Sequence, residues 1–308
     1  MKISIIGAGN VGSALAERVL TANIADIVLV DIAEDIAKAK AMDLTDASSL
    51  AGYSKRITGT GNYKKTEGSR VVFVTAGFPR KPGMSRDDLI AKNAHIVKAV
   101  VKNIKTYAPE AILVLVTNPL DVMTFIAYKE FGCERKRILG MAGNLDTARF
   151  TALLSSELNI PHEKIETFVL GSHGDTMVPI LSKTRVDKKP LKDVLGKEAI
   201  EGLVEKTKKR GAEVVRLLKS GSAYFSPSAA CLEILKAVIG DEKKVIPCSC
   251  VLEGEYGLKG CAIGVPAIIG KNGIHEVLQW DLPEDEKRAL KNSAKAVKDA
   301  INTSSNQK

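Results

Sequence analysis

The first part of the chain alternates short apolar runs, rich in Val and Ile, with longer segments whose apolar residues recur at helical spacing. Such runs are typical of strands that are buried on both faces of a parallel sheet. The pattern predicts strands over residues 2–6, 27–31, 70–75 and 111–117, and helices over residues 10–22, 34–50 and 87–106. This alternation predicts an α/β fold with a doubly wound parallel sheet.

The pattern changes near Gly143, where strands and helices no longer alternate. Helices are predicted over residues 145–159, 197–219 with an interruption at Gly211, 228–239, and from the acidic start at 283–286 onward. Strands are predicted over residues 165–170, 245–252 and 261–269, the last two antiparallel, and the polar tail 303–308 is expected to fray. We therefore expect a Rossmann-type domain over residues 1–142 and an α+β substrate domain over residues 143–308.

The chain is long enough, at 308 residues, to bury two packed cores without disulfide bonds. Its longest apolar stretches are too short to span a bilayer, and no secretory signal pattern opens the sequence. We therefore expect a cytoplasmic protein without membrane contact. The net charge is +9, but acidic residues interleave the cations and aromatic residues do not, which favours a solvated surface over a nucleic-acid site.

Five cysteines provide no metal-binding or disulfide pattern. Their number is odd, none forms a CxxC pair, and Cys248 and Cys250 are too close in sequence for ordinary tetrahedral zinc ligation. On a strand, Cys248 and Cys250 would point to the same face. We expect reduced thiols and no metal.

A glycine-rich segment follows the first predicted strand. The order strand, Gly7-Ala8-Gly9-Asn10-Val11-Gly12, helix is the context that the dinucleotide-binding fingerprint requires. The glycines permit a tight turn, a close approach to a pyrophosphate and close helix packing, and the helix N-terminus offers N–H groups to the phosphates. A purely structural turn is the alternative. Asp31 ends the second strand and would bind an adenosine ribose, which favours NAD over NADP.

The segment Gly171-Ser172-His173-Gly174-Asp175 supplies the candidate acid/base. Histidine titrates near neutral pH, and His173 lies between two glycines at the end of a predicted strand. His95, His162 and His275 are expected to be structural or exposed. Two further polar features precede it along the chain.

Asp146 and Arg149 are three residues apart on a predicted helix and therefore face the same side. Asp146 could orient His173, and Arg149 could bind a carboxylate through its planar fork. A surface ion pair is the alternative for this pair. Asn118 follows an apolar strand and could donate to a substrate oxygen, or it could be a turn residue before Pro119, whose peptide bond could be cis.

Together these segments resemble the lactate and malate dehydrogenases, in order and over nearly the whole chain. The most specific likeness is the loop Phe78-Pro79-Arg80-Lys81-Pro82-Gly83-Met84-Ser85-Arg86, which resembles that of malate dehydrogenases in the lactate-dehydrogenase-like group. The resemblance implies reversible hydride transfer between malate and NAD, a place in the tricarboxylic acid cycle, and a homo-oligomer, with a tetramer favoured over a dimer.

The resemblance also implies roles for individual residues. His173 would be the proton acceptor, paired with Asp146, and Arg149 would bind the carboxylate beside the reacting carbon. Arg86 would polarise the carbonyl as the loop closes, and Arg80 would bind the distal carboxylate. Asn118 would contact substrate and cofactor. NAD would also be contacted by Asn93, Val116, Asp31 and the loop Gly7, Ala8, Gly9, Asn10, Val11 and Gly12.

Arg80 favours a dicarboxylate over lactate, because lactate would leave its guanidinium buried and unpaired. Breaking a buried ion pair costs about 3–5 kcal/mol, which is on the order of a hundred- to several-thousand-fold in specificity. A dehydrogenase for lactate or another 2-hydroxy acid remains the main alternative. A third alternative, a glycosidase that uses NAD and a metal, would need Cys and His residues at metal-ligand spacing, which this sequence does not contain. A fourth, an NAD-binding module without catalysis, would not need the polar residues described above.

Overall fold

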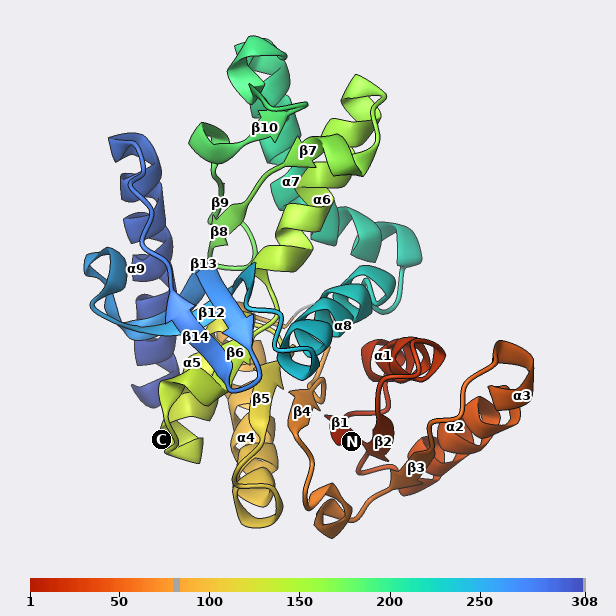
Figure 1. The fold of residues 1–308 in the computed structure, drawn as a ribbon. Coiled ribbons are helices and arrows are strands. Elements are labelled where there is room, and N and C mark those ends of the chain that lie inside the picture. Colours follow the sequence, from red (N-terminus) through yellow and green to blue (C-terminus); the bar gives the residue numbers. More distant parts are fainter. Residues whose placement is uncertain (80–83, 307–308) are drawn as a thin grey trace.

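The computed structural model describes the backbone of residues 1–79 and 84–306, and their side chains except those of residues 86 and 304–306. Within these ranges the chain forms one eleven-stranded sheet, whose first six strands are parallel and have the order β3-β2-β1-β4-β5-β6 (Figure 1). These strands are β1 (Lys2–Ile6), β2 (Asp26–Val30), β3 (Ile57–Thr60), β4 (Val71–Val74), β5 (Ile112–Leu115) and β6 (Ile138–Gly140). This is the strand order of dinucleotide-binding folds.

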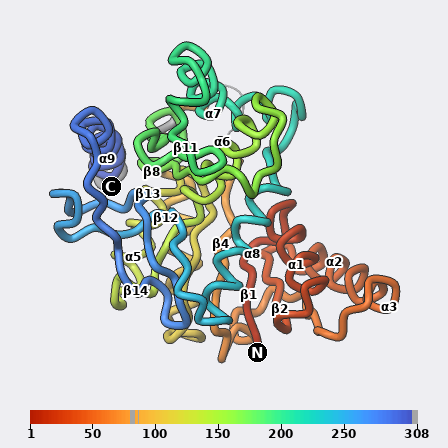
Figure 2. The backbone as a smooth tube through the Cα atoms, turned by 45° about the horizontal axis from the view of Figure 1, so that its top comes forward, coloured from red at the N-terminus to blue at the C-terminus, as the bar shows by residue number. Residues whose placement is uncertain are grey.

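The sheet continues beyond β6 with antiparallel strands. β12 (Lys244–Glu253) pairs with β6 through Ser249 and Gly140, and β13 (Lys259–Gly270), β8 (Val169–Gly171) and β9 (Met177–Pro179) follow in space. β14 (Gly273–Val277) pairs with β13. A separate small sheet contains β7 (Ile165–Glu166), β10 (Arg185–Val186) and β11 (Lys189–Pro190), on the side of the molecule away from the N-terminal strands (Figures 1 and 2).

Helices cover both faces of the sheet. The helices are α1 (Asn10–Thr21), α2 (Glu34–Asp46), α3 (Ser48–Ala51), α4 (Arg86–Tyr107), α5 (Leu120–Phe131), α6 (Gly143–Leu158), α7 (Lys197–Leu218), α8 (Phe225–Ile239) and α9 (Glu284–Asn306). Short 3-10 turns span Tyr63–Thr66, Arg135–Arg137, His162–Lys164, Leu181–Lys183, Leu191–Asp193 and Glu255–Gly257. Because crossovers between parallel strands are right-handed, α1 and α4, which lead in opposite directions along the sheet, lie on opposite faces. α1 packs on α8, and α4 and α5 pack on α9.

One apolar core runs through both the parallel and the antiparallel parts of the sheet. β4 and β5 are buried along their whole length, as their aliphatic sequences predict. A smaller core around Phe150 lies between α6, α7 and the small sheet. Among the described residues, no helix has both the length and the apolar character needed to cross a bilayer.

The strands and helices predicted for the first part are confirmed close to their predicted bounds, except that residues 34–50 form two helices that meet at Ala47. The sequence pattern missed β3, α5 and β6. α5 was missed because nearly every residue of its first two turns is buried, so it has no polar face to give a helical period.

Three predictions for the second part are wrong in detail. Residues 165–170 are not one strand, because the chain passes at Thr167 from the small sheet into the main sheet. α7 continues through Gly211, since a single interior glycine costs a helix only about 1 kcal/mol. Residues 303–306 are helical and belong to the last turns of α9. The division into domains at residues 142 and 143 stays a prediction.

Candidate active site

The candidate site lies where the parallel strands end. Gly7 follows β1, Asp31 follows β2, and Asn118 lies beyond β5, so the topology brings all three to the carboxyl edge of the sheet. The antiparallel part contributes His173 just after β8, and α6 contributes Asp146 and Arg149.

The partly exposed His173 forms a hydrogen-bonded pair with the buried Asp146. The Nδ1 atom of His173 lies 2.8 Å from Oδ2 of Asp146, and the Asp146 side chain is 2% exposed. The other oxygen, Oδ1, accepts a hydrogen bond from Arg149 at 3.3 Å, and the Arg149 side chain is 11% exposed. The alternative of a surface ion pair is therefore wrong. One carboxylate connects the candidate base with the candidate carboxylate-binding cation.

The surroundings of His173 favour its protonated form. Burial alone would lower the pKa of His173, but the negative charge and hydrogen bond of Asp146 outweigh burial, and the pKa is raised. Arg149 opposes this shift, and Asp121 supports it. Burial lowers the pKa of Arg149, and Asp146 counteracts this effect; a guanidinium stays charged throughout the working range of proteins.

Close backbone packing fixes the loop that carries His173. Gly171 has a positive φ of 83°, and it pairs with Gly264 of β13. A Cβ at Gly264 would lie 2.5 Å from the Gly171 carbonyl oxygen, so no side chain fits there. The next amide, that of Ser172, donates to the Ser293 hydroxyl of α9 at 2.8 Å. The loop is thus held from two sides.

The glycine loop is shaped as a dinucleotide fingerprint requires. Gly7 has a φ of 110°, and a Cβ at Gly12 would collide with the Gly7 carbonyl oxygen. At Gly9, by contrast, no described atom lies within 4 Å of the Cβ position. Gly9 precedes α1, and no described side chain caps this helix N-terminus. The open space and the unshared N–H groups fit a phosphate-bearing cofactor.

Asp31 and Lys40 bracket this loop. The Asp31 carboxylate accepts hydrogen bonds from the amides of Ala8 at 2.7 Å and Ala33 at 2.9 Å. Lys40 of α2 donates to the Ala8 carbonyl at 2.7 Å and to the Ser13 hydroxyl at 2.9 Å. Lys40 was missed in the sequence, because a lysine in a helix gives no signal of a contact across the fold.

Asn118 and Asn93 are joined beside the same edge. The Asn118–Pro119 peptide bond is cis. The buried Asn93 side chain donates to the Asn118 carbonyl at 2.6 Å and bonds with both the amide and the carbonyl of Phe78. Asn93 therefore ties the start of the loop at Phe78 to the Asn118 turn. Val116, at the end of β5, is buried.

The structure does not describe the side chains of the two loop arginines for which roles are predicted. Arg80 lies outside the described residues, and so does the side chain of Arg86. The Arg86 backbone begins α4, inside a capping box in which the side chains of Ser85 and Asp88 each accept a hydrogen bond from the other's backbone amide.

The cysteines and the other three histidines are not among the candidate site residues. All five thiols are free, and Cys248 and Cys250 point to one face of β12 with their sulfurs 3.6 Å apart, as the spacing predicts. His95, His162 and His275 are exposed. In the described ranges, no group of three His, Cys, Asp or Glu side chains is arranged to hold a metal ion.

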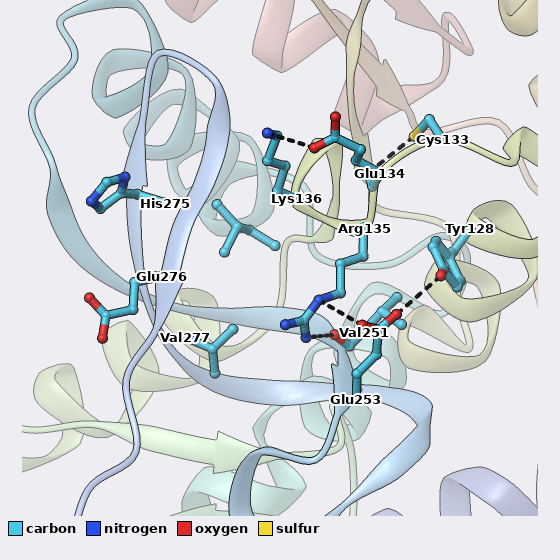
Figure 3. Close-up of a pocket in the computed structure, with 11 residues that line it drawn as sticks. Tyr128, Cys133, Glu134, Arg135, Lys136, Val251, Glu253, His275, Glu276 and Val277 are labelled. Carbon is cyan, nitrogen blue, oxygen red and sulfur yellow. Dashed lines mark hydrogen bonds and ion pairs between the residues drawn. The ribbon is translucent and has the colours of Figure 1, made fainter.

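A surface pocket of about 450 Å³ contains none of the candidate residues. Among its lining residues Arg135 pairs with Glu253, and Lys136 pairs with Glu134 (Figure 3). Glu276 also lines the pocket, so its three carboxylates outnumber its two Lys and Arg side chains.

Comparisons with known proteins agree with this geometry. Residues 1–140 match the family model of the lactate/malate dehydrogenase NAD binding domain, and residues 143–308 match that of the lactate/malate dehydrogenase alpha/beta C-terminal domain. The malate dehydrogenase of Chloroherpeton thalassium is 43% identical over 301 residues, which cover 97% of each chain.

Solved structures show the same fold. The Cryptosporidium parvum malate dehydrogenase superposes with a TM-score of 0.96 at 37% identity, over 99% of this chain and 98% of that chain. The Cryptosporidium parvum lactate dehydrogenase, solved with lactic acid and the dinucleotide, also gives 0.96 at 37% identity, over 100% and 98%. With both family models matched along nearly its whole length, the chain belongs to the lactate/malate dehydrogenase family.

Proposed function

We propose that this protein is an NAD-dependent malate dehydrogenase that interconverts (S)-malate and NAD with oxaloacetate and NADH. The group Asp146–His173–Arg149 carries this proposal. In it the buried Asp146 carboxylate bonds both to the candidate acid/base, His173, and to the cation that would bind a substrate carboxylate, Arg149. The nucleotide loop at the same edge of the sheet supplies the cofactor side.

In malate oxidation, His173 accepts the hydroxyl proton through Nε2, because Asp146 holds Nδ1. NAD, when bound, would supply the acceptor for the hydride that leaves the substrate carbon. The Asp146 carboxylate stabilises the imidazolium that forms, and the Arg149 fork holds the adjacent substrate carboxylate. Arg86 polarises the carbonyl in the reverse reaction, and Asn118 contacts substrate and cofactor.

Asp31 and the glycine loop select NAD. The fingerprint loop, with its open space at Gly9, would hold the pyrophosphate, and Asp31 would bind the adenosine ribose. A 2′-phosphate would approach the Asp31 carboxylate and be repelled, which disfavours NADP. Asn93 and Val116 complete the wall of this site.

Malate rather than lactate is the proposed substrate. The fold does not separate the two, since the malate and lactate enzymes of Cryptosporidium parvum superpose equally well. The name of the 43% identical Chloroherpeton relative, and the presence of Arg80 in the loop, favour the dicarboxylate.

We further propose a cytoplasmic homo-oligomer, a tetramer in preference to a dimer, that works in the tricarboxylic acid cycle. Several large apolar side chains that are more than half exposed support self-association. Four of them lie on α2, α3, the end of α7 and the start of α8: Met42, Leu50, Leu217 and Phe225. Sedimentation equilibrium of the purified protein tests the assembly; a monomer at all concentrations contradicts it.

The direct test compares NADH oxidation with oxaloacetate and with pyruvate, and repeats both with NADPH. Fast turnover of oxaloacetate with NADH alone is expected. A preference for pyruvate would contradict the assignment of malate as substrate but would agree with the proposed hydride transfer. NADH binding without turnover of either acid would favour the alternative of an NAD-binding module without catalysis.

A further inference from the structure

A second buried carboxylate, Asp121, lies behind the candidate base. Asp121 belongs to the first turn of α5, three residues after Asn118, and is 2% exposed. The mechanism described above does not use it. A buried carboxylate is costly to desolvate unless it is well hydrogen-bonded, so its contacts are informative.

Asp121 bonds directly to the residue that carries the imidazole. Its Oδ2 accepts a hydrogen bond from the backbone N–H of His173 at 2.8 Å. Its Oδ1 accepts from the Ser249 hydroxyl of β12 at 2.6 Å, and the Ser172 hydroxyl also donates to this carboxylate. Asp121 therefore joins α5, β12 and the loop after β8 at one point.

The charges around this point come from several elements. Asp146 and Arg149 face His173 from α6, and Asp121 faces it from α5. Cys261 of β13 is near enough to Asp121 for their charges to interact, and Lys298 of α9 lies near Cys261. Burial raises the pKa of Asp121, and the hydrogen bonds from Ser249, His173 and Ser172 offset this effect only in part, so the pKa stays above its ordinary value.

We propose that Asp121 is a positioning residue of the active site, which anchors the His173 main chain through its amide and supplies a second negative charge behind the imidazole. This proposal rests on the proposed function in assigning His173 as the acid/base. Asp146 orients the ring from one side, and Asp121 fixes the backbone from which the ring projects. The Asn118 turn and the His173 loop are thereby held at a constant separation by α5.

The test measures the imidazole of His173 directly, by NMR titration of the intact protein labelled at its histidines. The sequence has four histidines, and the His173 signal is identified by its loss in His173→Asn. Asp121→Asn keeps the size of the side chain and an oxygen for the His173 amide but removes the charge. We expect the pKa of His173 to fall, because the negative charge of Asp121 is one of the causes that raise it.

Thr124→Val is the matched control. Thr124 is buried one turn further along α5, and its hydroxyl bonds to the Leu120 carbonyl. This variant should leave the His173 titration at the wild-type value. An unchanged pKa in Asp121→Asn, or an equal fall in Thr124→Val, would overturn the charge effect.

Amide hydrogen exchange of the wild-type protein tests the anchor without any variant. The His173 amide lies in a loop, so slow exchange is expected only because Asp121 accepts its hydrogen bond. Exchange at the rate of an unprotected amide would overturn the anchor. Both measurements are independent of turnover, so a missing dehydrogenase activity would refute the proposed function while leaving these results readable.

Discussion

The Nδ1 atom of His173 and the Oδ2 atom of Asp146 are 2.8 Å apart, and the second oxygen of the same carboxylate bonds to Arg149. Because water barely reaches Asp146, its charge acts on the imidazole with little screening. One carboxylate therefore both raises the proton affinity of His173 and holds Arg149.

The two directions of the reaction should depend on pH in opposite ways. Reduction of oxaloacetate needs the imidazolium, and the pKa of His173 is raised above its ordinary 6.5, so kcat/KM for reduction should stay high past that pH and then fall. Malate oxidation needs neutral His173 and should rise over the same interval. Profiles of kcat/KM against pH in both directions check this. If kcat/KM for reduction already declined as the pH was raised toward 6.5, the prediction would be contradicted.

Asp146→Asn should lower the pKa of His173 and leave Arg149 without its acidic partner. We expect kcat/KM for oxaloacetate reduction to fall on the order of 100-fold or more, with the remaining activity shifted to lower pH. Asp187→Asn is a suitable control, because Asp187 is exposed and has a positive φ of 48°, which asparagine tolerates. Equal losses in both variants would argue against a specific role for Asp146.

Gly12→Ala and Gly9→Ala should separate folding from cofactor binding. A methyl group at Gly12 collides with the Gly7 carbonyl, so we expect a loss of about 1–3 kcal/mol of stability. A methyl group at Gly9 meets open space, so the Tm should stay unchanged while NADH binds more weakly. Thermal unfolding and fluorescence titration with NADH measure the two effects. An unaltered NADH affinity in Gly9→Ala would show that the pyrophosphate does not bind at Gly9.

Arg80→Gln should reduce the preference for the dicarboxylate. If Arg80 binds the distal carboxylate, the ratio of kcat/KM for oxaloacetate to that for pyruvate should fall about 100-fold or more. Lys81→Gln removes a neighbouring cation from the same loop and should leave the ratio nearly unchanged. The comparison is made with NADH under identical conditions, and an unaltered ratio in Arg80→Gln would exclude this role.

The sequence predicts the local parts of the site better than the distant ones. The glycine loop, Asp31 and the pair Asp146 and Arg149 are each encoded within one or two adjacent segments, so spacing alone indicates their chemistry. Asp121 and Lys40 act through partners that are 52 and 32 residues away along the chain. Neither residue type nor periodicity reveals such contacts, because only the packed fold creates them.

The errors in the predicted fold also come from packing that the sequence pattern does not show. α5 is buried on nearly all sides, and its sequence therefore has no amphipathic stripe. The strand predicted over residues 165–170 changes sheets midway, which a continuous apolar run cannot indicate. The sequence pattern predicts a helix break at Gly211, yet α7 continues through it. A Cβ at Gly211 would lie 3.6 Å from the guanidinium of Arg149, so the glycine backbone packs beside that side chain.

The junction between β6 and β12 has a consequence for protein engineering. β6 is the last parallel strand, and β12, about a hundred residues later, covers its outer edge through Ser249 and Cys250. A fragment that ended at residue 142 would keep β6 but lose this cover. Its apolar edge would then present unpaired N–H and C=O groups, which are a template for aggregation. The cofactor-binding half is therefore best expressed together with the strands that shield it.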